Sequence, residues 1–209
     1  MTSLVRPAIV LFVLLSIVTG VVYPLAVTGI ARIVFPAQAD GSIITSDGKA
    51  IGSSLIGQDF SGDPRFFWGR LSATGPVAYT AFNADKGSGS SGSNLSPTNP
   101  TLIDNARARI EALNAADAAA GIQRPAGQTV PVDLVTSSGS GLDPHISPAA
   151  AEYQAPRIAH ENRLSPEVVR GLIARFTEGR TWGVLGEPRV NVLRLNLALK
   201  ELTAQPPHP

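Results

Sequence analysis

The feature that constrains this chain most is an uncharged, apolar stretch close to its N-terminus. No charged residue occurs from position 8 to position 30, and Val, Leu and Ile dominate the stretch. As an α-helix it would extend about 34 Å, slightly more than the roughly 30 Å hydrocarbon core of a bilayer. Arg6 and Arg32 flank it, where long basic side chains reach the headgroups. The sequence therefore predicts one membrane-spanning helix, in contact with lipid.

Residues inside this stretch also predict a helical partner in the membrane. Gly20, Pro24 and Gly29 would weaken a helix in water. In a membrane they are tolerated where a second helix packs alongside. Together with the neighbouring Tyr23, these residues are our candidates for contact with that helix.

A cleaved signal peptide and a buried soluble helix are the two alternatives to an anchor. Ala37-Gln38-Ala39 resembles a small-x-small cleavage site, but the apolar core of a signal peptide is only about 7–15 residues long. We therefore expect residues 1–7 to be a short N-terminus, 8–34 the membrane helix with its flank, and 35–209 a soluble domain. The basic residues on the two sides nearly balance, so charge alone does not orient the span. The short N-terminus favours a domain outside the cytoplasm.

Composition excludes several classes of function. The chain has 17 Lys plus Arg and 16 Asp plus Glu, a formal net charge of +1, so no basic surface for nucleic acid is indicated. It has no cysteine, which rules out disulfides and thiolate metal sites.

The first half of the soluble domain is organised by turns. Asp47-Gly48 separates two β-prone runs within residues 42–58 and predicts a hairpin. The aromatic residues of segment 66–70 are expected in the core. Residues 87–94 are rich in Gly and Ser and predict a loop. Asn99-Pro100 predicts the start of a helix, and residues 115–129 are expected to be its frayed end and a linker.

The second half predicts a mixture of strands and helices. Residues 130–136 resemble a buried strand, and Ser147-Pro148 and Ser165-Pro166 predict helix starts. The first of these helices is expected to kink or restart at Pro156, and the second to end near Gly179. Val190 and Val192 alternate like a strand, a short helix to Leu202 follows, and residues 203–209 form a tail. The expected fold class is α+β, with one N-terminal membrane helix.

Catalytic motifs are not found in this sequence. Neither G-x-x-x-x-G-K-[ST] nor G-x-G-x-x-G occurs, so no nucleotide loop is predicted. Ser140 lies near Asp143 and His145 but lacks the G-x-S-x-G elbow. The three histidines lack metal-ligand spacing. We therefore expect no catalytic residue, no metal and no directly bound cofactor.

Several segments, in order along the chain, carry a resemblance to a known family. They are residues 20–30 (GVVYPLAVTGI), 35–42 (FPAQADGS), 52–58 (GSSLIGQ), 91–95 (SGSNL), 99–100 (NP), 130–148 (VPVDLVTSSGSGLDPHISP), Gln154, 156–157 (PR), 190–193 (VNVL) and 195–196 (LN). This pattern resembles the C subunit of the Kdp potassium-transporting ATPase. Leu71 departs from it, because the family usually has proline there.

The resemblance implies a non-catalytic accessory subunit of a bacterial inner-membrane potassium pump. Its implied partners are a channel-like potassium-translocating subunit and a P-type catalytic subunit that uses ATP. The family's C subunit is described as assisting assembly and raising the ATP affinity of the catalytic subunit, with its soluble domain outside the cytoplasm. A domain placed there does not reach cytoplasmic ATP, so any such effect is expected to travel through the complex.

The resemblance also directs attention to particular residues. Gln154 is the position that a nucleotide-binding role in the family would single out. Candidates for contact with partner subunits in the soluble domain are Asn94, Gly139, Ser140, Gly141, Asp143 and His145. Two alternatives remain from the residues alone: a membrane-anchored extracytoplasmic hydrolase that uses Ser140, Asp143 and His145, and an anchored solute-binding module.

Overall fold

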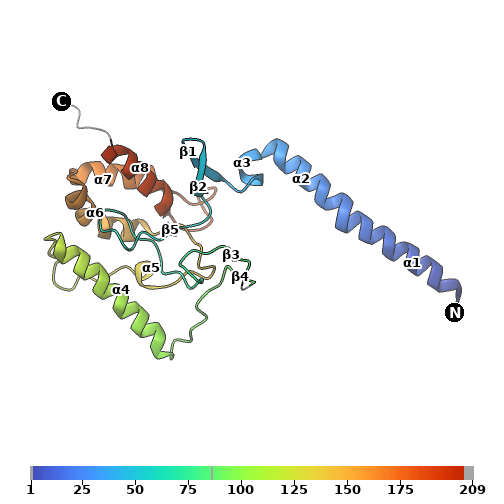
Figure 1. Cartoon of the computed structure of the whole chain (residues 1–209), viewed down its shortest axis with the longest axis horizontal. Helices are drawn as coiled ribbons and strands as arrows, with labels where there is room; N and C mark the ends of the chain where they lie inside the picture. Colours follow the sequence, from blue (N-terminus) through green and yellow to red (C-terminus); the bar gives the residue numbers. More distant parts are fainter. Residues whose placement is uncertain (1, 86, 205–209) are drawn as a thin grey trace. The chain divides into compact units, whose positions relative to one another are not determined.

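The computed structural model describes residues 2–85 and 87–204, and the side chains from residue 4 onward (Figure 1). The described chain divides into two compact units, with the boundary between Ser53 and Ser54. The first unit contains the apolar helix and one β-hairpin. The second contains the remaining strands and helices, and each unit is described here by itself.

The apolar stretch forms one long helix, from Leu4 to Val34, and its most apolar part has no buried residue. It consists of α1 (Thr2–Ile17), a π-helical turn (Val18–Val22) and α2 (Tyr23–Val34), followed by the short α3 (Pro36–Ala39). It is long and apolar enough to span a membrane, as the sequence predicts.

Pro24 explains the π-helical turn. It has no N–H to donate to the carbonyl four residues earlier, and the Tyr23 N–H bonds to the Val18 carbonyl, five residues back. The Thr19 hydroxyl donates to the Leu15 carbonyl at 2.7 Å and satisfies an acceptor in the same region. The helix therefore continues past Pro24 with a local change of hydrogen-bond pattern.

The predicted hairpin is confirmed. Strands β1 (Ile43–Ser46) and β2 (Lys49–Ser53) pair antiparallel, with a register shift between Ile44 and Thr45. Asp47 and Gly48 have φ of +50° and +74°, as expected where both central residues of a tight turn are left-handed.

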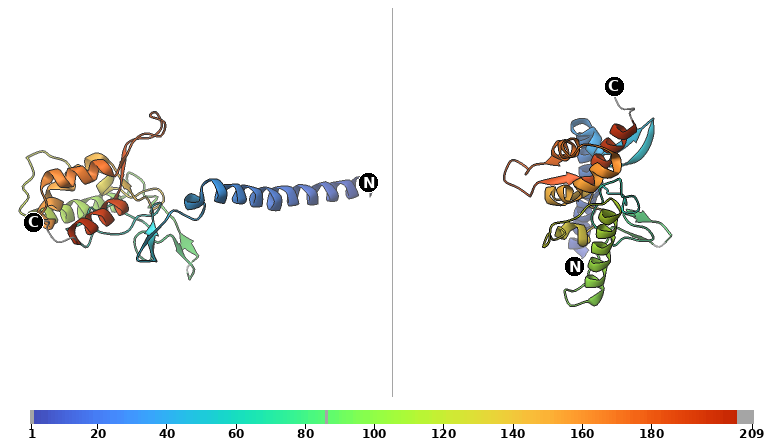
Figure 2. Two further views of the ribbon diagram at one scale, coloured as in Figure 1. Left: turned by 90° about the horizontal axis from the view of Figure 1, so that it is seen from above. Right: turned by 90° about the vertical axis from the view of Figure 1, so that its left-hand side faces the viewer.

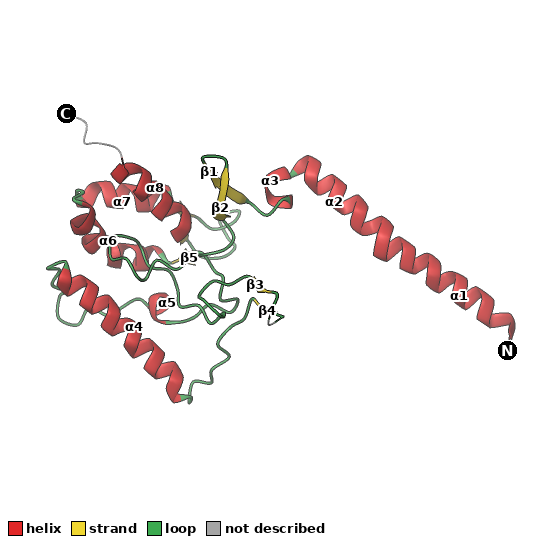
Figure 3. Ribbon diagram, viewed as in Figure 1, coloured by secondary structure: helices red, strands yellow, loops and turns green. Residues whose placement is uncertain are grey.

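The regular secondary structure of the second unit is mainly helical, with short strands, and long loops connect it (Figure 3). Its helices are α4 (Pro100–Ala119), α5 (Val132–Val135), α6 (Pro148–Asn162), α7 (Pro166–Arg175) and α8 (Val192–Ala204). Strands β5 (His145–Ile146), β7 (Arg189–Asn191) and β6 (Thr177–Glu178) form an antiparallel sheet in the order β5-β7-β6, and β3 (Phe82–Asn83) pairs with β4 (Ser88–Gly89). This confirms the α+β class.

Three helices begin as their sequences predict. The side chains of Asn99, Ser147 and Ser165 each accept a hydrogen bond from a backbone N–H of the first turn, and a proline follows each of them. Helices α6, α7 and α8 pack in succession. They bury the main apolar cluster, to which Phe67 and Trp68 contribute as expected.

Other expected boundaries were wrong. Residues 130–136 do not form a strand, because Val132–Val135 makes one helical turn in which Leu134 is buried and Val132 is 70% exposed. Helix α6 does not restart at Pro156, one of the two expected outcomes there, since buried residues on both sides of the proline hold it in the core. Helix α7 ends at Arg175, before Gly179.

The remaining differences lie at element ends. Val192 begins α8 and does not belong to β7. Helix α4 continues through five residues of the expected linker, to Ala119, because its last turns are rich in alanine. The expected loop at residues 87–94 contains the two residues of β4.

Candidate functional site

The segment from Ser137 to His145, which joins α5 to β5, lies against residues of two other loops. The Ser140 carbonyl accepts from the Ser91 N–H at 2.8 Å, and the Gly141 carbonyl accepts from the Ser72 hydroxyl at 2.6 Å. The Leu142 carbonyl accepts from the Gly57 N–H at 2.8 Å. Three successive backbone carbonyls of the loop therefore accept hydrogen bonds from residues about 50 to 85 positions earlier in the chain.

The two glycines of this loop have different surroundings. Gly141 is buried with φ +68°, and a Cβ on it would lie 2.6 Å from the Ser91 carbonyl oxygen and from a methyl group of Thr74. A Cβ on Gly139 would meet nothing within 4 Å. Gly139 and Ser140 are exposed. Only these two residues of the loop's centre are therefore available to a partner.

Asp143 and His145 form a local pair. Asp143 Oδ1 accepts from the His145 backbone N–H at 3.0 Å and contacts Nδ1 of its ring at 3.1 Å. Arg70 Nη1 lies 3.4 Å from the other carboxylate oxygen. Burial acts to raise the pKa of Asp143, but the His145 hydrogen bonds and the charges of His145 and Arg70 outweigh it, so this pKa is lowered.

The arrangement does not build a serine triad. The Ser140 hydroxyl oxygen accepts from the Leu142 N–H at 3.1 Å. His145 Nε2 instead lies 3.5 Å from Asn191 Nδ2 and 3.9 Å from a Glu178 carboxylate oxygen. Within residues 2–85 and 87–204 no hydrogen bond joins Ser140 to His145, so the hydrolase alternative has no geometric support. Across the same residues, no group of three or more His, Asp or Glu could hold a metal ion.

Gln154 lies in the core, on helix α6. Its side chain is completely buried. Oε1 accepts from the Trp68 N–H at 2.8 Å and from Arg157 Nη2 at 2.9 Å, while Nε2 donates to the Trp68 carbonyl at 3.1 Å and to the Ala150 carbonyl at 3.3 Å. All four hydrogen-bonding positions of the amide are thus used inside the protein.

A buried arginine supports this arrangement. Arg157 is completely buried, lies over the Trp68 ring at 4.9 Å and faces Asp117, with Nε 3.6 Å from Oδ1. Burial lowers its pKa to about 10, against the raising effect of the Asp117 charge. Asn196 binds the Phe67 backbone as Gln154 binds that of Trp68. Its Oδ1 accepts from the Phe67 N–H and its Nδ2 donates to the Phe67 carbonyl, each at 2.9 Å. The aromatic segment is therefore fixed by polar groups that sequence patterns did not reveal.

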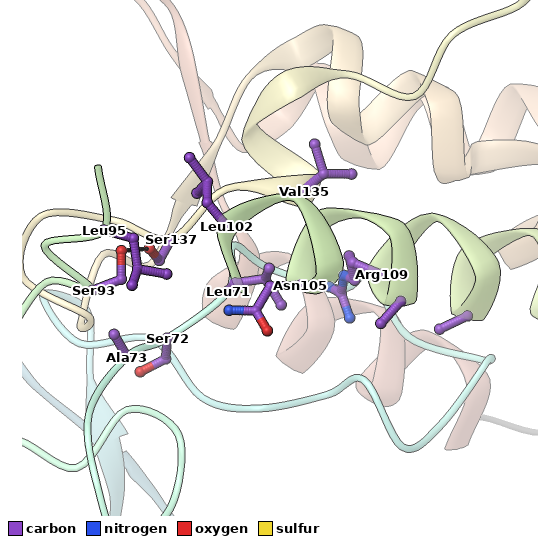
Figure 4. A pocket seen from close by; sticks show the side chains of 12 residues that line it. Leu71, Ser72, Ala73, Ser93, Leu95, Leu102, Asn105, Arg109, Val135 and Ser137 are labelled. Carbon is purple, nitrogen blue, oxygen red and sulfur yellow. Dashed lines mark hydrogen bonds between the residues drawn. The ribbon is translucent and has the colours of Figure 1, made fainter. Parts of the chain in front are cut away.

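A cavity of about 390 Å³ lies beside the same loop (Figure 4). Leu71, Leu102 and Val135 supply much of its apolar lining, and the hydroxyl groups of Ser93 and Ser137 bond to each other at 3.1 Å at its edge. Leu71, the departure from the family pattern, thus contacts this cavity. Asn94 has φ +51° and lies between the lining residues Ser93 and Leu95.

The four candidates in the apolar helix lie on an uncovered surface. Gly20, Tyr23, Pro24 and Gly29 are exposed, and a Cβ at either glycine would meet nothing within 4 Å. Gly20 lies within the π-helical turn. These positions are therefore free for contact with lipid or another helix.

Comparison with known proteins gives a consistent answer. Residues 5–201 match the model of the family described as "K+-transporting ATPase, c chain". The chain is 58% identical over 204 residues to the potassium-transporting ATPase KdpC subunit of Dechloromonas aromatica (strain RCB), covering 97% of this chain and all of that one. It is 57% identical over 202 residues to the KdpC subunit of Polaromonas naphthalenivorans (strain CJ2), covering 97% and 96% of the two chains. The chain therefore belongs to the KdpC family and is an accessory subunit of the potassium-transporting ATPase, not its catalytic one.

Proposed function

We propose that the chain is a single-pass inner-membrane subunit that assists the assembly of the potassium-transporting ATPase, with its folded second unit outside the cytoplasm. Its partners in this proposal are the channel-like subunit that carries potassium and the P-type subunit that hydrolyses ATP. The observation that carries the proposal is the uncovered apolar helix Leu4–Val34 in a chain of this family. A single helix does not line a pore, so transport belongs to the partners.

We further propose that the chain raises the ATP affinity of the catalytic subunit without binding ATP itself. The buried Gln154 amide, whose bonds are all internal, supports this separation. The absence of a nucleotide-loop motif from the sequence supports it as well. In this proposal, contacts between subunits transmit the effect.

The orientation of the chain is tested by thiol labelling. The sequence has no cysteine, so a single Cys at the exposed Ala115 of α4 is a unique reporter. We expect Ala115→Cys to react with a membrane-impermeant maleimide in intact spheroplasts. A matched Thr2→Cys variant should react only after lysis. The reverse pattern would place the second unit in the cytoplasm.

The apolar helix is tested as an interface through Gly20. We expect Gly20→Leu to reduce co-purification of the partner subunits about tenfold, because a bulky side chain prevents close approach of a second helix. Membrane insertion should be unchanged, since the span becomes more apolar. Val10→Leu, which removes no glycine, is the matched control. Normal assembly of Gly20→Leu would show that this glycine faces lipid.

A further inference from the structure

Strands β6 and β7 are joined by an arm, residues 179–188, that projects from the second unit (Figure 2). The tip of the arm is apolar and uncovered. Trp182 is 86% exposed, Val184 70% and Leu185 54%. Within residues 2–85 and 87–204 the Trp182 indole N–H makes no hydrogen bond, although a tryptophan N–H that becomes buried usually requires one.

The arm is an ordered structure despite its exposure. Thr181 and Leu185 exchange backbone hydrogen bonds of 2.8 and 3.0 Å, which close the tip. Arg180 pairs with Glu187 at 2.7 Å across the arm. Trp182 has φ +55°, a conformation in which a bulky residue is uncommon. The fold thus holds a large aromatic side chain outward in a backbone conformation that it does not favour.

We propose that Trp182 anchors this arm in an apolar pocket of another subunit of the ATPase complex, with a carbonyl or carboxylate group accepting from the indole N–H. The inference rests on the proposed function, because it requires an assembled complex. Val184 and Leu185 complete the inserted surface. A tryptophan that becomes fully desolvated in the pocket of a partner is a typical anchor of a protein interface.

The charges of the arm favour a protein pocket over a lipid surface. Residues 181–186 carry no charge. Of the flanking basic residues, Arg180 is paired with Glu187, and Arg189 is paired with Glu178 at 3.0 Å. Surface binding to anionic lipid uses unpaired Lys and Arg beside the apolar residues, and this arm offers none.

Area argues against a second copy of the chain as the occupant. A tryptophan buries about 150–250 Å². Two tips in contact would cover much less than the roughly 1,000 Å² that a stable interface needs. A pocket in a partner subunit does not need to bury this area by itself. In the proposed complex the apolar helix already attaches the chain to the partner subunits, and this raises the effective concentration of the arm.

The test is protection of the arm in the assembled complex. Val184→Cys leaves Trp182 in place and is the unique thiol of this chain. Its labelling rate is compared between the full chain alone and the purified complex in the same detergent, with the labelled subunit identified by mass. We expect labelling in the complex to be at least about tenfold slower, as for a desolvated interface centre. Phe82→Cys, at a 72% exposed position outside the arm, reports general shielding.

A second variant tests the anchor itself. Trp182→Ala should increase loss of the chain from the complex during washing about tenfold, with an unchanged melting temperature, whereas Phe82→Ala should behave as wild type.

The labelling experiment separates this inference from the proposed function. If Val184→Cys reacts equally fast in the complex and in the free chain, the inference is overturned, while co-purification of the partner subunits still upholds the proposed function. Slower labelling of Val184→Cys in the chain alone, when it is placed in phosphatidylglycerol and phosphatidylethanolamine vesicles, would identify lipid as the occupant instead. Slower labelling of the chain alone when its concentration in detergent is raised would identify a second copy. If no partner subunit co-purifies, the proposed function and this inference both fail.

Discussion

Replacing Gln154 with Ala is expected to lower the free energy of unfolding of the full chain in detergent by about 2–4 kcal/mol. The amide bonds both the N–H and the carbonyl of Trp68 and also contacts Arg157, with its own side chain fully buried. Removing it leaves two backbone groups and a buried cation with fewer partners. Urea unfolding, followed by the fluorescence of the buried Trp68, measures the loss.

Glu152→Gln is the matched control for this change. Glu152 lies two residues away on the same helix but is exposed, so its substitution should change stability by less than about 0.5 kcal/mol. A nucleotide contact at Gln154 would give a different result. The unfolding free energy of Gln154→Ala would then be unchanged, while the KM for ATP of the assembled complex would rise.

Replacing Gly141 with Val is expected to destabilise the chain by about 3 kcal/mol or more. The backbone has φ +68°, which disfavours a β-branched residue. The new Cβ would also lie 2.6 Å from the Ser91 carbonyl oxygen. The Ser91 backbone has little freedom to move away, because its N–H donates to the Ser140 carbonyl at 2.8 Å.

Gly139→Val separates a structural role of this loop from docking. Gly139 is exposed, and a Cβ there meets nothing within 4 Å, so stability should change by less than about 1 kcal/mol. If the exposed residues 139–140 dock against the channel-like subunit, this variant assembles poorly with an unchanged melting temperature. If Gly139→Val assembles normally, the loop serves the fold alone.

The parts of the fold that the sequence predicted well depend on local chemistry. Helix starts at Asn99, Ser147 and Ser165 follow from a capping side chain and the next proline. Asp47-Gly48 determines its turn because both residues adopt positive φ. These signals act within a few residues and need no knowledge of tertiary packing.

The wrong predictions concern segments where packing decides. Residues 130–136 are apolar and short, and such a run suits a strand or one helical turn equally. In the structure this segment forms α5, and the Asp133 carboxylate of this helix accepts from the Ser147 N–H at 2.6 Å. Pro156 likewise lies within a helix because its neighbours are buried on both sides.

The candidate site was only partly predictable. The pairing of Asp143 with His145 is local and fits their spacing. The contacts of the loop with Ser72 and Ser91 join segments about 50 to 70 residues apart, so no local pattern reveals them. The Trp182 arm did have a signal, an apolar Trp-Gly-Val-Leu-Gly run between Arg180 and Glu187, but its exposure depends on the fold.

Membership of an assembled potassium pump is tested most directly by purifying the tagged full chain in mild detergent and identifying the accompanying chains by mass spectrometry. The predicted result is co-purification of both the channel-like subunit and the P-type catalytic subunit. Recovery of the chain without either subunit, from membranes in which both are shown to be present, would contradict the account.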